Sequence, residues 1–153
     1  MINKASNDKK GFTIIEVVLV LAVAALIFLI VFLAVPSLQR SRRDTARKND
    51  LGRLMSQLES YASNNNGDYP TTGNFNNFVT QYMGNDFKDP SKGTAYKWVG
   101  TDPALGQVQY GKNKKCSADN KLITGSGGIR EIAVRIRIEQ GGASATYFCQ
   151  DNQ

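Results

Sequence analysis

The chain has 153 residues and a formal net charge of +6 at pH 7, which leaves room for one modest domain and a membrane segment. It contains no histidine, so the side chain most often used as a general base is absent. No glycine-rich stretch has the spacing of a phosphate-binding loop. We therefore expect neither an enzyme nor a bound cofactor.

The first eleven residues form a short charged leader that ends in Lys9, Lys10 and Gly11. Residues 12–35 are then apolar apart from a threonine and Glu16. This run has about the ~20 residues that a helix needs to cross ~30 Å of hydrocarbon. An acid in such a helix is costly and is by default a functional-site hypothesis. The alternative is a carboxylate that lies near the membrane interface.

The helical pattern continues after Pro36 with one apolar face. That face repeats at three- and four-residue spacing and comprises Leu51, Leu54, Met55, Leu58, Tyr61 and Ala62. We expect one helix over residues 12–63, with 12–35 as its membrane or filament-core part. The basic residues of this region are expected to lie mostly off the apolar face, namely Arg42, Arg43, Arg47, Lys48 and Arg53.

Residues 64–153 have the pattern of a small sheet domain. We expect a short helix at 74–83 and strands at 95–99, 107–110, 121–124, 129–139 and 144–149. The strand at 129–139 alternates apolar with mostly charged residues, which predicts one buried and one solvent-exposed face. The expected fold class is α+β, with the long helix packed on a small antiparallel sheet.

The N-terminal segment resembles the class III signal peptide of type IV prepilins and type II secretion pseudopilins. The resemblance rests on Lys9 and Lys10 before Gly11, on Phe12, and on Glu16 as the fifth residue from Phe12. It implies that prepilin peptidase cuts between Gly11 and Phe12 and that the new amine is N-methylated. It further implies that Glu16 pairs with such an amine during assembly, and that the fold is pilin-like.

The resemblance also implies a life cycle. The chain would be a single-pass membrane protein, cleaved of its leader 1–11, and then part of an extracellular pilus with residues 64–153 as its globular domain. Its partners would be copies of itself, minor pilins, prepilin peptidase and, indirectly, the inner-membrane assembly platform and its ATPase. The resemblance implies that the leader lies on the cytoplasmic side and the globular domain outside. The positive-inside rule favours the opposite orientation, because five basic residues follow the apolar run from Arg40 to Lys48.

Three functions are compatible with these features. The first is a type IV pilus subunit that serves twitching motility, attachment to surfaces or host cells, or DNA uptake. The second is a pseudopilin of a type II secretion or competence system. The third is a membrane-anchored binding domain that does not polymerise, for which an uncleaved bond between Gly11 and Phe12 would be the mark.

The chain has two cysteines, Cys116 and Cys149. In an exported domain such a pair is expected to form a disulfide, and its loop of about 30 residues would contribute roughly 3–4 kcal/mol in the chain-entropy model. The alternative is two unpaired buried thiols. A zinc site is not expected, because the chain offers neither a histidine nor a third cysteine.

Two further groups of charged residues are candidate sites. The first is a basic group that comprises Lys112, Lys114, Lys115 and Lys121. This group indicates either a solvated loop or a patch that binds DNA or an acidic cell surface. The segments 69–71 and 89–96 resemble major pseudopilins of type II secretion, in which nearby acids bind calcium. The corresponding candidates are Asp86, Asp89 and Asp102, and the alternative is that these aspartates simply form turns.

Overall fold

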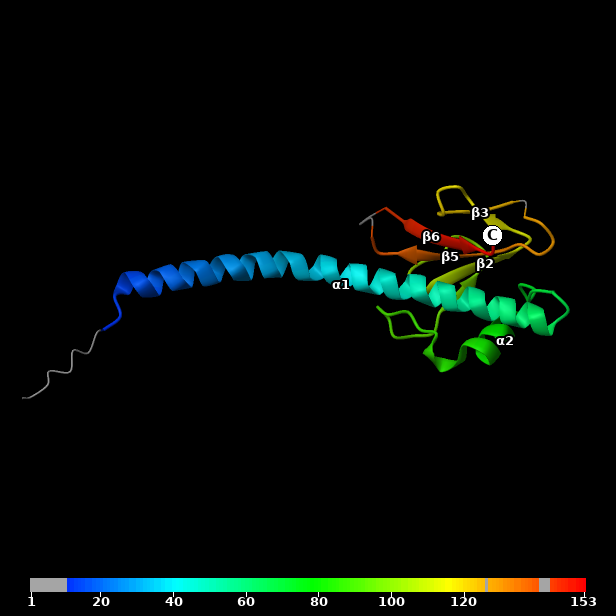
Figure 1. Ribbon diagram of the computed structural model, residues 1–153, viewed down its shortest axis with the longest axis horizontal. Helices are drawn as coiled ribbons and strands as arrows, with labels where there is room; N and C mark the ends of the chain where they lie inside the picture. The colour runs from blue at the N-terminus through cyan, green and yellow to red at the C-terminus, as the bar shows by residue number, and fades with distance from the viewer. Residues whose placement is uncertain (1–10, 126, 141–143) are drawn as a thin grey trace, which may run out of the picture. The chain divides into compact units, whose positions relative to one another are not determined.

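The computed structural model describes residues 11–125, 127–140 and 144–153. It forms two units, Met1–Leu38 and Gln39–Gln153, which adjoin within the long helix α1 (Figure 1). The elements are α1 (Ile14–Asn64), α2 (Phe75–Phe78), a π-helix (Val79–Met83), a 3-10 helix (Gly84–Asp86), β1 (Lys97–Val99), β2 (Gln107–Lys112), β3 (Lys115–Cys116), β4 (Ile123–Thr124), β5 (Ile132–Ile138) and β6 (Thr146–Asp151). The expected α+β class is confirmed.

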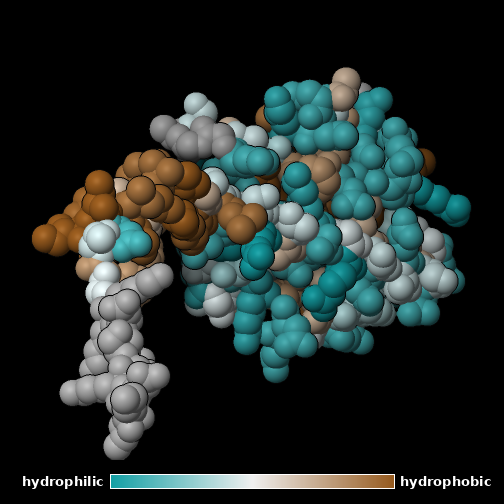
Figure 2. Space-filling model, turned by 60° about the vertical axis from the view of Figure 1, so that its left-hand side comes forward, coloured by the Kyte–Doolittle hydropathy of each residue, from teal (hydrophilic) through white to brown (hydrophobic). Residues whose placement is uncertain are grey.

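The first unit consists of the leader and the apolar part of α1. The helix continues through Pro36, and it contains a stretch that is long and apolar enough to cross a membrane. The large apolar side chains of this unit are exposed, from Phe12, at 89%, to Leu38, at 54%. In Figure 2, hydrophobic residues dominate the helical part of this unit, whereas hydrophilic residues dominate the visible surface of the second unit. An apolar surface of this size requires lipid or protein to cover it.

The second unit is a helix-on-sheet layer built around the amphipathic part of α1. Leu51, Leu54 and Leu58 have no exposed surface and belong to one core cluster with residues of β2 and β5. The four-stranded sheet has the order β1-β2-β5-β6. In its register, Val108 of β2 lies opposite Ile136 of β5, so their side chains share the face that packs on the helix.

An aromatic cluster fills one end of this core. Phe75 of α2 stacks on Tyr110 with ring centroids 4.6 Å apart and lies 5.0 Å from Trp98. The expected helix at 74–83 is divided into α2 and a π-helix. With the wider turn, Tyr82 stacks on Phe78 at 5.2 Å, and both rings pack edge-on against Tyr61 of α1. The segment therefore deviates from a regular helix where its aromatic rings meet α1.

The expected small sheet is present, but it is mixed, because one pair of its strands is parallel. β1 pairs with β2 in parallel, with Lys97 opposite Gln107, and the other neighbouring strands of this sheet are antiparallel. The segment that connects β1 to β2 turns back through the buried Pro103 and through Gly106, whose φ is +78°. A side chain at Gly106 would meet Lys92 at 3.2 Å. Both constraints favour glycine, which closes this short parallel connection.

The second face of β5 is also buried, so the expected solvent-exposed face of this strand was wrong. Ala133 and Arg135 are 0% and 3% exposed. The small sheet of β3 and β4 supplies Cys116 and Ile123, which pack with Ala133 and Cys149. The charges at this face indicated solvent exposure, but the disulfide-linked segment covers part of it.

Candidate functional site

The N-terminal end of α1 is held by a capping box. Residues 11–13 are not helical, and the helix starts at Ile14. Glu16 Oε2 accepts hydrogen bonds from both Thr13 N and Thr13 Oγ1 at 2.8 Å. In return, Glu16 N donates to Thr13 Oγ1 at 3.4 Å. A threonine followed three residues later by a glutamate satisfies backbone donors that a helix start leaves unpaired.

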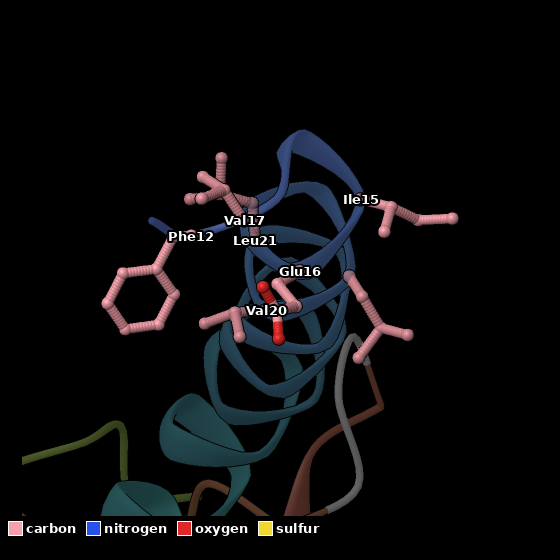
Figure 3. A pocket seen from close by; sticks show the side chains of 7 residues that line it. Phe12, Ile15, Glu16, Val17, Val20 and Leu21 are labelled. Carbon is pink, nitrogen blue, oxygen red and sulfur yellow. The ribbon is translucent and has the colours of Figure 1, made fainter. Parts of the chain in front are cut away.

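The surroundings of the Glu16 carboxylate are otherwise apolar. Phe12, Ile15 and Val20 are among the residues that line a pocket with Glu16. Figure 3 shows Phe12 and Val20 on the side of the helix opposite Ile15, with the Glu16 carboxylate beside Val20. Within the described residues, Thr13 alone hydrogen-bonds this carboxylate. The arrangement leaves a carboxylate available to a cation at the start of an apolar helix.

Gly11 lies in open space. A Cβ built at this position would meet no atom within 4 Å. The peptide bond between Gly11 and Phe12 lies before the first helical residue, so it is outside the hydrogen-bonded helix. Lys9 and Lys10 lie outside the described residues.

A second, unexpected charged cluster lies inside the second unit around Arg47. This side chain is 0% exposed. Its Nε donates to Asp89 Oδ2 at 2.8 Å, and its Nη1 is 2.9 Å from Asp44 Oδ1 and 2.8 Å from Glu139 Oε1. Glu139 also binds Arg43 through two hydrogen bonds of 2.9 and 2.6 Å. The cluster therefore joins α1 to the loop before β1 and to the end of β5.

The charges in this cluster stabilise one another. Although burial opposes it, the hydrogen bonds from Arg47 and Ser91 lower the pKa of Asp89 to about 2. Hydrogen bonds from Arg43 lower the pKa of Glu139. Asp44 also accepts hydrogen bonds at 2.8 Å from the backbone N–H groups of Glu139 and Gln140. These contacts fit a rule for buried charges, which are tolerated when they are paired and hydrogen-bonded.

The expectation that Arg47 lies off the packed face was wrong. Arg42 and Arg53 are exposed as expected, but Arg47 lies one turn before Leu51 and continues its buried face. Sequence spacing contained this signal, because positions 47, 51, 54 and 58 share one side of a helix. The charge of the arginine argued against burial, and its partners Asp89 and Glu139 are too distant in sequence to be recognised by spacing.

The three aspartates considered for calcium are not gathered into one site. Asp89 forms an ion pair with Arg47, and Asp102 forms one with Arg135. Asp86 is exposed. Among the described residues, no group of three or more acidic, histidine or cysteine side chains could hold a metal ion. The cation that neutralises Asp89 in this structure is the guanidinium of Arg47.

The two cysteines form a disulfide, with their Cα atoms 5.8 Å apart. Part of the basic group lies nearby, on and around β3 and β4. Lys112 is half-buried, donates to the carbonyl of Tyr69 at 3.1 Å and lies 3.7 Å from Asp68. Lys115 and Lys121 are exposed, and Lys121 lies 3.8 Å from Asp119. Lys114 is half-buried. Lys112 thus contacts other residues of its own domain, whereas Lys115 and Lys121 leave charge at the surface.

Comparison with known protein families finds a match at the N-terminus. Residues 6–32 match the prokaryotic N-terminal methylation motif. The match spans the leader from residue 6, Gly11, Phe12, Glu16 and most of the apolar run. Comparison of the chain with curated proteins and with solved structures gives no match.

Proposed function

The chain carries a class III signal peptide with the N-terminal methylation motif that marks type IV pilins and pseudopilins, and from this we propose that it is the precursor of a type IV pilus subunit. The motif indicates a structural protein rather than an enzyme, and the apolar helix fits a membrane-anchored precursor. In the proposal, the subunit leaves the membrane and polymerises through residues 12–35 into an extracellular filament. Motility, attachment and DNA uptake are the roles open to such a filament.

One observation carries the proposal: the methylation motif stands directly at the start of a helix whose apolar side chains are exposed. Lipid covers this surface before assembly and equivalent helices of other subunits cover it in a filament. The hydrophobic driving force for covering it is roughly 25 cal/mol per Å² of apolar surface removed from water. Packing of the helices therefore supplies most of the cohesion in the proposed filament.

Processing would take place between Gly11 and Phe12. Nothing around Gly11 fills the space of a side chain, so the fold of the described residues gives no reason for a glycine there. A requirement for glycine would come from the peptidase, which must bind the chain closely at the cut. The capping box that starts the helix at Ile14 leaves this bond outside the helix, where a peptidase can bind an extended chain.

Glu16 would set the register of each added subunit. In the precursor, Thr13 supplies both hydrogen bonds that the carboxylate accepts. Cleavage creates a new amine at Phe12, and its positive charge gives Glu16 a stronger partner in its own or a neighbouring subunit. Buried charges must be paired, and such a pair favours one geometry even where its net stabilisation is small.

Glu16→Gln tests this role, because the amide keeps the shape of the side chain and removes its charge. We expect normal processing of the variant but few filaments in a sheared surface fraction. Glu59→Gln is the matched control, since Glu59 is an exposed acid on the same helix. Filaments of Glu16→Gln at the yield of the Glu59→Gln control would rule out the pairing.

A further inference from the structure

A pocket of about 230 Å³ lies between the start of the second unit and the end of β5. Its lining combines two arginines with two apolar side chains and one acid, namely Arg40, Arg137, Leu105, Ile138 and Glu139. Arg40 comes from α1, Leu105 from the connection between β1 and β2, and the other three from the end of β5 and the residue after it. Three separate segments thus form one small amphipathic site.

The pocket carries a surplus of positive charge. Glu139 is its one acid, and both oxygens of Glu139 are already paired with Arg43 and Arg47 at 2.6 to 2.9 Å. Arg40 and Arg137 take part in no ion pair and no side-chain hydrogen bond among residues 11–125, 127–140 and 144–153. Two guanidinium groups therefore remain available to an anion.

The place of the pocket along the helix indicates which anion reaches it. Arg40 follows the exposed Leu38 by two residues of α1, which is about 3 Å at ~1.5 Å of rise per residue. The polar layers of a bilayer add roughly 5–7 Å on each side of its hydrocarbon core. With the apolar part of α1 in the membrane, Arg40 lies at the depth of the lipid headgroups.

We propose that this pocket binds the phosphate group of a membrane phospholipid while the precursor is in the bilayer. Arginine guanidinium groups bind phosphate oxygens in bidentate fashion, and Leu105 and Ile138 provide an apolar wall for the glycerol and the first methylene groups. The inference rests on the membrane-anchored stage of the proposed function. The site would hold the second unit against the membrane surface until the subunit is extracted.

An acidic side chain from another copy of this chain is the competing occupant. The lipid is favoured for two reasons. The site begins five residues after the apolar run 12–35 and two residues after the exposed Leu38, where phospholipid headgroups are concentrated. The chain is also surrounded by lipid before it meets other copies in a filament.

The test is a titration of the full chain in maltoside micelles, which contain no phosphate. Arginine Nε–H signals are followed by NMR while dihexanoyl phosphatidylglycerol is added, and Arg40→Gln and Arg137→Gln assign the two signals. We expect both signals to shift together and saturate. Each of these two variants should weaken binding roughly tenfold, the size expected for losing hydrogen bonds between charged groups.

Arg42→Gln is the matched control, because Arg42 is exposed on the same helix, carries the same charge and does not line the pocket. It should change the affinity by less than about twofold, as expected for a screened surface charge. An Arg42→Gln effect as large as that of Arg40→Gln would indicate general charge attraction and overturn the site.

Two further outcomes would overturn the assignment to lipid. Inorganic phosphate that shifts both signals with equal affinity would assign the pocket to a free anion. Shifts that follow protein concentration rather than lipid would assign it to a contact between copies. None of these results bears on cleavage at Gly11 or on filament assembly, so the proposal on lipid can fail while the proposed function stands.

Discussion

Replacing Arg47 with alanine is expected to destabilise the second unit strongly. The arginine is 0% exposed and faces three carboxylates, of which the Asp89 side chain is 0% exposed and the Asp44 side chain 3%. After the replacement, these acids keep their hydrogen bonds from Ser91, Glu139 and Gln140 but lose the shared cation. Removal of one partner from a buried pair typically costs about 3–5 kcal/mol, and the lower part of that range applies here because backbone donors remain.

Urea unfolding of the full chain in detergent micelles measures this cost. Trp98 is the single tryptophan and packs against Phe75 at 5.0 Å, so its fluorescence reports on the core of the second unit. We expect Arg47→Ala to lower the free energy of unfolding by about 3 kcal/mol. The control is Arg53→Ala, whose side chain is 52% exposed and lies 3.6 Å from Asp50, and it should change stability by less than about 1 kcal/mol.

A double-mutant cycle separates the ion pair from the lost volume. Arg47→Met keeps much of the side-chain volume, and Asp89→Asn removes the opposite charge. If the pair acts as described, the double variant costs less than the sum of the two single variants by about 1–3 kcal/mol. Strictly additive effects, or a loss below about 1 kcal/mol for Arg47→Ala, would refute the reasoning that these buried charges depend on one another.

Three other outcomes are expected. The pKa of Asp89 falls from 3.8 to about 2 in the fold, so its contribution is present above the unfolded value and is lost as the pH drops from about 4 to 2. The loss amounts to about 2 kcal/mol at 1.36 kcal/mol per pKa unit. Urea midpoints should fall across this window in the wild type and less in Asp89→Asn. Replacing both Cys116 and Cys149 with serine opens a link of 33 residues and should reduce stability by about 3–4 kcal/mol, whereas an unchanged urea midpoint would contradict this. Tyr110→Phe leaves the buried carbonyl of Pro70 without the hydroxyl that donates to it at 2.8 Å. It should cost about 1–2 kcal/mol with little change in the near-ultraviolet signal of the aromatic cluster, and a neutral effect would contradict it.

Local patterns were sufficient for the helix and the main strands. The expected helix at 12–63 and the observed α1, Ile14–Asn64, differ by two residues at the start and one at the end. β5 and β6 occupy the predicted regions with shifted ends, because strand ends depend on the neighbouring strand. The two-residue strand β3 was not predicted, because Lys115 and Cys116 are too few to show a period.

Tertiary pairing accounts for the features that the sequence did not predict. Arg135 and Arg47 have the charge of surface residues, but both are buried against acids far away in sequence, Asp102 and Asp89. The parallel pairing of β1 and β2 depends on a connection of unusual shape, which hydrophobic alternation does not encode. By contrast, Thr13 and Glu16 are three residues apart, and this spacing is a known capping signal. The capping box is therefore readable from the sequence, in addition to the two interpretations of Glu16 as an assembly residue or as a carboxylate near the membrane interface.

The most direct test of the proposed function is the N-terminal residue and mass of the protein in a sheared surface fraction. The account predicts a chain that begins at Phe12, is heavier by one methyl group than the unmodified product, and is recovered in extracellular fibres. A processed chain that is missing from the sheared fraction would instead indicate a pseudopilin. An intact chain that begins at Met1 and stays in the membrane would contradict the account, because a precursor that is never cleaved cannot supply the Phe12 amine on which the proposed assembly depends.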